Sequence, residues 1–297
     1  MRKLFSAFMG VISVLTLIVY TLFLGIFLFL AILLRFLLPT TLARTYANPL
    51  IVEVALIWVG GILWWLRRIH RVQLDMAHDL TLDMQQWNLI IANHQSWLDI
   101  FVLFFVTYRK LPVLKFFIKS QLIWVPVAGA AWWALDYPFM SRYSKSYLEK
   151  HPEKAGKDLE TTKRACEKFS EQPTSVVNFL EGTRFTKAKH QQQQSPYRHL
   201  LKPKAGGVAF ALQALGEKFS TVIDATLHYE GGAPSTWDVA CGRIGKVTIR
   251  LQKRHIPDAF LTMDYTNNAD DKAAFQAWIT QLWQEKDSLL ESLDNTR

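Results

Sequence analysis

The stretch NLIIANHQSWLDI, residues 88–100, decides the fold. The apolar run LIIA at 89–92 predicts a buried strand, and Asn93 and His94 follow that strand directly. In open α/β sheets, ligands bind at the carboxyl ends of the strands. The stretch therefore indicates an α/β fold and, at His94, a candidate functional position within it.

A capping box follows the histidine. Ser96 stands where a helix N-cap is expected, and Asp99 comes three residues later. Side chains on a helix lean toward its N-terminus, so Asp99 is aimed back at His94. The prediction is a histidine with one ring nitrogen held by a carboxylate and the other available for a substrate proton. A second interpretation stays open on these residues alone: Ser96 and Asp99 only cap a helix, and His94 is a core residue.

A second polar motif closes another predicted strand, at residues 175–180. It reads Glu181, Gly182, Thr183, Arg184. Glycine lets the backbone approach a ligand closely, and the guanidinium of arginine matches the geometry of phosphate. The alternative is a Glu-Arg ion pair at a polar strand end. Two strand ends on one sheet, one with a base and one with an anion clamp, favour a functional site.

Beyond Arg71, short apolar runs alternate with helical patterns. The predicted strands are residues 87–92, 134–140, 175–180, 221–227 and 246–251. The predicted helices are residues 99–108, 152–169, 203–215 and 270–293, the last with a core-facing apolar stripe. This order predicts an α/β domain, a mainly parallel sheet flanked by helices. The polar run at 187–197 predicts a surface loop that could act as a lid.

The first residues are strongly apolar. Residues 4–34 carry no formal charge, and a helix of that length measures about 46 Å against a hydrocarbon core of ~30 Å. Because a signal peptide has a shorter apolar core, we expect a permanent anchor, either a strongly tilted span or a tight re-entrant hairpin. A second apolar run at 50–66 would cross the bilayer or lie along its surface. The predicted domains are a membrane-anchoring segment at 1–71 and a catalytic domain at 72–297.

Charge and cysteine usage indicate the compartment and the partners. Arg67, Arg68 and Arg71 follow the second apolar run, which favours the cytoplasmic side for the N-terminus and the body. The net charge of +9 suits an anionic membrane surface or an anionic substrate. No nucleic-acid-binding motif is found, so no nucleic-acid partner is expected. Cys166 and Cys241 have neither metal-ligand spacing nor a disulfide framework, which indicates a reducing compartment.

The two motifs resemble those of the glycerolipid acyltransferases, over about residues 88–228. His94 and Asp99 match the family's His-x4-Asp motif, and residues 179–184 match its Glu-Gly-Thr-Arg block. The bacterial 1-acylglycerol-3-phosphate acyltransferases, PlsC-like, are the most similar group, and within them the YihG branch. The remaining matches are Lys119, Pro126 and Gly129 between the blocks, Arg142 in the second block and Lys204 to Gly207 after the third. Ser141 and the proline-free block at 222–227 depart from the family pattern, at positions that bear on acceptor and chain preference.

The resemblance implies the glycerolipid acyltransferase fold and a reaction in phospholipid biosynthesis. An acyl chain would pass from an acyl thioester, acyl-CoA or acyl carrier protein, to the sn-2 hydroxyl of 1-acyl-glycerol-3-phosphate (lysophosphatidic acid), giving phosphatidic acid. His94 would be the general base and Asp99 its partner, with no covalent intermediate, no metal and no cofactor. The implied substrate-binding residues are Glu181, Gly182, Thr183, Arg184, Lys119, Arg142 and Lys204. The implied location is the bacterial inner membrane, with the bilayer as partner and the catalytic domain facing the cytoplasm.

Two other classes remain to be separated by experiment. A metal-dependent hydrolase would use His94 and Asp99 as ligands and would lose activity with chelators. A non-catalytic membrane scaffold would keep its biological activity after His94→Ala. Within the acyltransferase interpretation, the alternative acceptor is another lysophospholipid with a larger headgroup.

Overall fold

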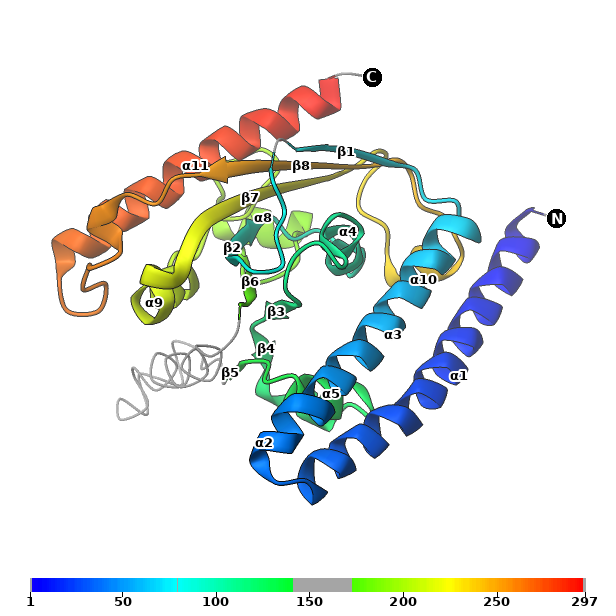
Figure 1. Ribbon diagram of the computed structural model, residues 1–297. Helices are drawn as coiled ribbons and strands as arrows, with labels where there is room; N and C mark the ends of the chain where they lie inside the picture. The colour runs from blue at the N-terminus through cyan, green and yellow to red at the C-terminus, as the bar shows by residue number, and fades with distance from the viewer. Residues whose placement is uncertain (1, 79, 141–172, 296–297) are drawn as a thin grey trace, which may run out of the picture. The chain divides into compact units, whose positions relative to one another are not determined.

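The computed structural model describes residues 2–78, 80–140 and 173–295 (Figure 1). The chain divides into two compact units, which we describe separately. The first unit comprises Met1–Arg71, Lys115–Phe169 and Trp237–Arg243. The second comprises Val72–Leu114, Ser170–Thr236 and Ile244–Arg297. The predicted division into an anchor at 1–71 and a catalytic domain at 72–297 stays a prediction.

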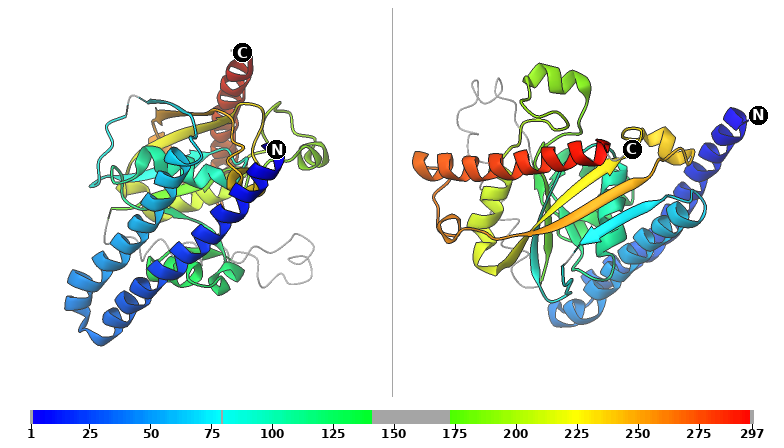
Figure 2. Two further views of the ribbon diagram at one scale, coloured as in Figure 1. Left: turned by 90° about the vertical axis from the view of Figure 1, so that its right-hand side faces the viewer. Right: turned by 90° about the horizontal axis from the view of Figure 1, so that it is seen from above.

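A helical hairpin forms the start of the first unit. Helix α1 (Arg2–Leu37) is joined through α2 (Thr40–Leu42) and the π-helical turn η1 (Ala43–Ala47) to α3 (Asn48–Arg68), and the two long helices lie side by side (Figures 1 and 2). The Tyr20 hydroxyl donates to the carbonyl of Ile57 at 2.7 Å, and the Trp58 indole donates to Thr21 Oγ1 at 3.0 Å. The predicted re-entrant hairpin within residues 4–34 is therefore wrong. No proline interrupts that run before Pro39, so it forms one continuous helix, and α3 supplies the return.

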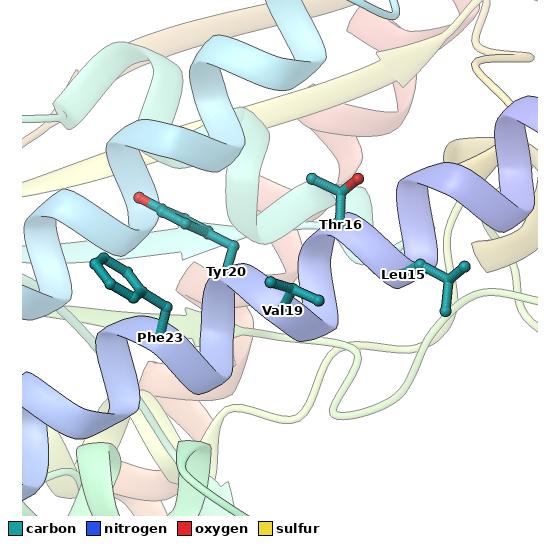
Figure 3. Close-up of a pocket in the computed structure, with 5 residues that line it drawn as sticks. All are labelled: Leu15, Thr16, Val19, Tyr20 and Phe23. Carbon is teal, nitrogen blue, oxygen red and sulfur yellow. The ribbon is translucent and has the colours of Figure 1, made fainter.

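Both long helices have the length and composition of membrane spans. The segments are Leu4–Leu37, with a mean hydropathy of 2.9, and Thr40–Arg68, with a mean hydropathy of 1.9. One face of α1 carries a hollow of about 440 Å³ lined by Leu15, Thr16, Val19, Tyr20 and Phe23, with Tyr20 directed toward α3 (Figure 3). This face is almost wholly apolar, which fits contact with lipid chains better than contact with water.

A small αβ segment packs against the hairpin within the first unit. It contains β4 (Ile118–Lys119), η2 (Ser120–Trp124), α5 (Ala128–Ala134) and β5 (Phe139–Met140), with β4 and β5 parallel. The Arg35 guanidinium donates to the carbonyl of Ala134 at 2.9 Å and fixes the end of α5. The predicted strand at 134–140 is wrong except for its last two residues, because Ala134 ends a helix. Helix α10 (Thr236–Ala240) also belongs here.

A six-stranded sheet, in the order β1-β8-β7-β2-β6-β3, supplies the second unit with all its described strands; of the edge strand β3, only Leu114 is counted in this unit. Its strands are β1 (Leu74–His78), β2 (Trp87–Ala92), β3 (Leu114–Phe116), β6 (Ser175–Phe179), β7 (Phe219–Tyr229) and β8 (Val247–Arg254). Strand β2 pairs in parallel with both β6 and β7, and β1 pairs in parallel with β8, whereas β7 and β8 are antiparallel. The predicted α/β fold with a mainly parallel sheet is confirmed. The apolar run at 89–92 is completely buried, as a central parallel strand requires.

Helices α4 (Leu98–Thr107), α8 (Lys187–Gln193), α9 (Gly206–Leu215) and α11 (Ala269–Asn295) accompany the sheet. Short 3₁₀ turns, η4 (Gly216–Lys218) and η5 (Asp258–Phe260), follow α9 and β8. The apolar stripe of α11 is buried, as predicted, through Phe275, Ile279, Leu282 and Trp283. The predicted loop at 187–197 is wrong in its first half. Thr186 caps α8 there by accepting from Lys189 N at 3.2 Å. The predicted helix at 152–169 lies outside the described residues.

Candidate active site

The two motifs meet because they follow neighbouring strands. Ala92 of β2 is paired with Phe179 of β6, so His94 and Glu181 each come two residues after the end of an adjacent parallel strand. Phe185 N donates to the carbonyl of His94 at 2.7 Å. This backbone hydrogen bond joins His94 to the Glu-Gly-Thr-Arg turn, so the two motifs lie together as predicted.

The His94 ring is held from two sides. Its Nδ1 lies 2.8 Å from Asp99 Oδ2, and its face stacks on Phe179 with 4.1 Å between ring centroids. The side chain remains 17% exposed, and no residue in the described part of the chain forms a hydrogen bond with Nε2. The carboxylate therefore holds an Nδ1–H tautomer, which leaves Nε2 as the proton acceptor.

Asp99 is completely buried, and both of its carboxylate oxygens accept hydrogen bonds. Oδ2 also accepts from Gln95 N at 2.6 Å and Ser96 N at 2.9 Å. The Ser96 contact is one of the two hydrogen bonds of the predicted capping box. The other is absent, because α4 has Trp97 at its N-cap and Ser96 Oγ accepts from Leu98 N at 3.3 Å. The Asp99 carboxylate therefore has two partners of different kinds: it accepts from the backbone at the start of α4, and it also holds the His94 ring.

Tyr229 is the site residue that the sequence interpretation missed. It ends β7, and its hydroxyl donates to Asp99 Oδ1 at 2.5 Å. Burial, followed by the neighbouring Asp99 charge, raises the pKa of Tyr229 well above its ordinary value, so the hydroxyl stays a donor. The available signal was weak: Tyr229 closes a third predicted strand, two residues beyond the predicted end.

Glu181 supports the backbone of the site. It is completely buried; one carboxylate oxygen accepts from His94 N at 2.7 Å and the other from Leu201 N at 3.1 Å. Burial outweighs these two donors and raises the pKa of Glu181 to about 8. Glu181 forms no ion pair with Arg184, so the alternative reading of this tetrapeptide as a Glu-Arg pair does not hold. The implied role of Glu181 in substrate binding stays a prediction.

Basic side chains gather around the turn that follows Glu181. Gly182 has a φ of +65°, which explains the glycine, and the Lys204 side chain passes beside it: a Cβ there would lie 3.1 Å from Lys204 Cδ and 3.4 Å from its Nζ. The Arg184 guanidinium lies over the Trp97 ring, 5.2 Å from its centroid. Lys189 of α8 donates to Thr183 Oγ1 at 2.7 Å. Of the other predicted cations, Lys119 lies in the first unit and Arg142 lies outside the described residues.

Asn93 and the block at 222–227 connect the strands on which the site stands. The Asn93 side chain both donates to and accepts from the backbone of Leu227, each at 2.8 Å, which joins the end of β2 to β7. The block at 222–227 lies within β7 and pairs on both sides, so the absence of a proline suits its central position. The departure at Ser141 lies outside the described residues.

The fold and the two joined motifs define an acyltransferase type of site. The Acyltransferase family model matches residues 66–229, more than half of the chain. The protein belongs to the Acyltransferase family.

Curated proteins with similar sequences are named as acyltransferases. Human 1-acyl-sn-glycerol-3-phosphate acyltransferase gamma is 27% identical over 217 residues, covering 68% of this chain and 52% of its own length. The human delta enzyme is 27% identical over 221 residues, covering 70% and 53%. An uncharacterized acyltransferase from Schizosaccharomyces pombe is 23% identical over 224 residues, covering 70% and 60%. The matches thus span little more than half the length of these relatives.

One solved structure has a similar fold along nearly the whole chain. It is the 1-acyl-sn-glycerophosphate acyltransferase PlsC from Thermotoga maritima, with a TM-score of 0.59, 16% identity and 98% coverage of both chains. At this identity the similarity shows the fold. The predicted glycerolipid acyltransferase fold is confirmed.

Proposed function

We propose that the protein transfers an acyl chain from an acyl thioester to the sn-2 hydroxyl of 1-acyl-glycerol-3-phosphate, giving phosphatidic acid. The observation that carries this proposal is the His94–Asp99 contact of 2.8 Å beside a turn rich in cations. The names of the curated relatives and of the PlsC structure support the choice of reaction.

His94 is the proposed general base. The attacking hydroxyl has a pKa far above neutral, so removal of its proton by Nε2 as the new C–O bond forms lowers the barrier, typically by 10²–10⁴-fold in rate. Asp99 orients the ring and stabilises the imidazolium that develops. The acceptor supplies its own hydroxyl, so the thioester carbon is attacked directly, the thiolate leaves, and no acyl-enzyme intermediate forms.

The acceptor phosphate is proposed to lie at the cationic turn. Arg184 presents several donors in one plane, and Gly182 lets the phosphate approach the backbone. Such contacts place the sn-2 hydroxyl near His94, which converts a bimolecular encounter into a positioned reaction. Lys119 and Arg142 remain proposed contributors to substrate binding.

The proposed setting is a membrane surface. Acceptor and product are amphiphiles, and α1 and α3 have the length and hydropathy of membrane spans. The bacterial inner membrane, with the catalytic domain on the cytoplasmic side, and a place in the YihG branch complete the proposal. The donor is acyl-CoA or acyl carrier protein.

A reconstituted assay tests the reaction. Purified protein in detergent is given labelled acyl-CoA or acyl carrier protein and a panel of lysolipids. Formation of phosphatidic acid that EDTA does not suppress, and that His94→Ala abolishes, is the expected result. Inhibition by EDTA would favour the hydrolase class, and equal turnover by His94→Ala would exclude the general-base role. Faster acylation of a lysophospholipid with a larger headgroup would establish the alternative acceptor.

A further inference from the structure

Three cations converge on one turn next to the base. Lys189 Nζ donates to Thr183 Oγ1 at 2.7 Å and to the carbonyl of Arg184 at 3.0 Å. Lys204 comes from the other side, with its backbone N–H bonded to the carbonyl of Leu180 at 2.7 Å. The second unit therefore contains a phosphate cluster, which we define as Arg184, Lys189 and Lys204 around Gly182 and Thr183.

The position of Lys189 in the phosphate cluster depends on the helix α8. Thr186 caps the helix, and the first turn then carries the Lys189 side chain back over the Glu-Gly-Thr-Arg turn. An ammonium group has three N–H donors, and the contacts to Thr183 and Arg184 engage two of them. The third N–H donor of Lys189 remains for a ligand, and it lies next to the backbone of Arg184.

Two of the three cations, Arg184 and Lys189, are not balanced by a carboxylate of the described residues. No aspartate or glutamate occurs from Gly182 to Gly216 in the sequence. Neither Arg184 nor Lys189 forms an ion pair with a carboxylate in the described part of the chain. Glu181, the nearest acid in sequence, is buried with both oxygens on backbone N–H groups. Two neighbouring cations that pair with no carboxylate in the described residues, Arg184 and Lys189, suit a ligand with more than one negative charge.

We propose that Lys189 completes the substrate phosphate site and makes it selective for a phosphate monoester over a phosphodiester headgroup. A monoester carries about −1.5 to −2 charges at pH 7 and three acceptor oxygens. A diester carries one charge and has one fewer terminal oxygen. A cluster with two or three cations therefore discriminates in favour of lysophosphatidic acid, whereas Arg184 alone would accept either headgroup.

The inference rests on the proposed function for the identity of the acceptor, but its test is a binding measurement that needs no turnover. Dissociation constants are measured by titration of the full chain in detergent with two ligands of the same acyl chain, lysophosphatidic acid and lysophosphatidylglycerol. The variants are Lys189→Met, Lys189→Arg and, as a matched control on the same helix, Lys187→Met. An acyl-CoA titration forms the donor arm.

Lys189→Met is expected to weaken lysophosphatidic acid binding about tenfold, the equivalent of one charge-assisted hydrogen bond, and lysophosphatidylglycerol binding much less. Lys189→Arg should keep most of the preference, and Lys187→Met should leave it unchanged. Equal losses for both lysolipids, or no loss, would overturn the selectivity role. A loss confined to acyl-CoA would assign the phosphate to the donor and overturn the acceptor assignment. A lost preference in a protein without acyl transfer would uphold the site and reject the reaction.

Discussion

Tyr229 donates its hydroxyl to Asp99 Oδ1 at 2.5 Å, on the carboxylate oxygen opposite the one that holds His94. Oδ2 accepts from the imidazole and two backbone N–H groups, and Tyr229 holds the opposite oxygen, so both oxygens of the carboxylate are fixed. A buried carboxylate with every contact satisfied keeps one orientation, and it transmits that orientation to the ring. The relation makes Tyr229 a positioning residue for the proposed base.

Tyr229→Phe should therefore slow acyl transfer without weakening substrate binding. One hydrogen bond to a charged group is worth ~1.5–3 kcal/mol, so kcat is expected to fall about tenfold or more while both KM values stay within about twofold. The pH profile of kcat should also move, because Asp99 loses a neighbour, whereas a purely structural role would leave it in place. Tyr265→Phe, another buried tyrosine of the same unit, is the control. An unchanged kcat and pH profile would remove Tyr229 from the mechanism.

Glu181 gives a prediction for pH. Its pKa is raised from the ordinary value of 4.5 to about 8, so the folded protein keeps this proton while the unfolded chain loses it. Between these values the folded state binds more protons, and the free energy of unfolding must fall as pH rises from about 5 to about 8. Thermal unfolding followed by circular dichroism should show this slope in the wild type.

Glu181→Gln should flatten that slope and lower the Tm throughout, because the amide can accept only one of the two backbone N–H groups. Glu230→Gln, at an exposed glutamate, should leave the slope as in the wild type. A Glu181→Gln variant with the full wild-type slope would show that Glu181 does not titrate in this range.

The membrane role of α1 is tested by a charge on its outer face. Ile26 is 59% exposed. In water, Ile26→Lys would be almost neutral, but near the middle of a bilayer a lysine costs ~2.5–3.5 kcal/mol. We expect Ile26→Lys to increase the fraction of protein released from membranes by alkaline carbonate. Phe5→Lys, near the helix end where a lysine reaches the interface, is the matched control. Identical release from both variants would contradict a lipid contact at Ile26.

Replacement of Lys286, in α11, is expected to lower the stability of the protein. It is completely buried, ion-paired with Asp224 and bonded to the carbonyl of Ala225 at 2.6 Å. Arg254 also pairs with Asp224 and would keep its charge compensated, but Lys286→Met removes the donor to the buried carbonyl of Ala225 and one of the two cations on Asp224. The free energy of unfolding should fall by about 1–3 kcal/mol. Lys272→Met, at an exposed position of the same helix, should cost less than about 1 kcal/mol. Denaturant titration compares them, and equal values would show that the Asp224 contact carries little energy.

The sequence predicted those parts of the site that are local. His94, Ser96 and Asp99 lie within six residues, and the capping box that joins them is a short-range pattern. Arg184 was predicted because it stands just after a predicted strand end and next to a glycine-containing turn. Tyr229 and Lys286 were missed because their partners are distant in the chain, and such pairing depends on strand order and helix docking. Lys189 was missed because its local contacts to Thr183 and Arg184 require the helix α8. The helix α8 was missed because a run of lysine and glutamine resembles a polar loop until Thr186 is recognised as its cap.

The central claim is that His94 removes the proton of the acceptor hydroxyl. Single-turnover acyl transfer by His94→Ala, with enzyme in excess and both substrates saturating, tests it most directly. His199→Ala, at a partly exposed histidine paired with Glu291, is the control for general effects of removing an imidazole. The account predicts a rate at least ~10²-fold below the wild type for His94→Ala, with unchanged donor and acceptor affinity. Transfer within about threefold of the wild-type rate by a folded His94→Ala protein would contradict it.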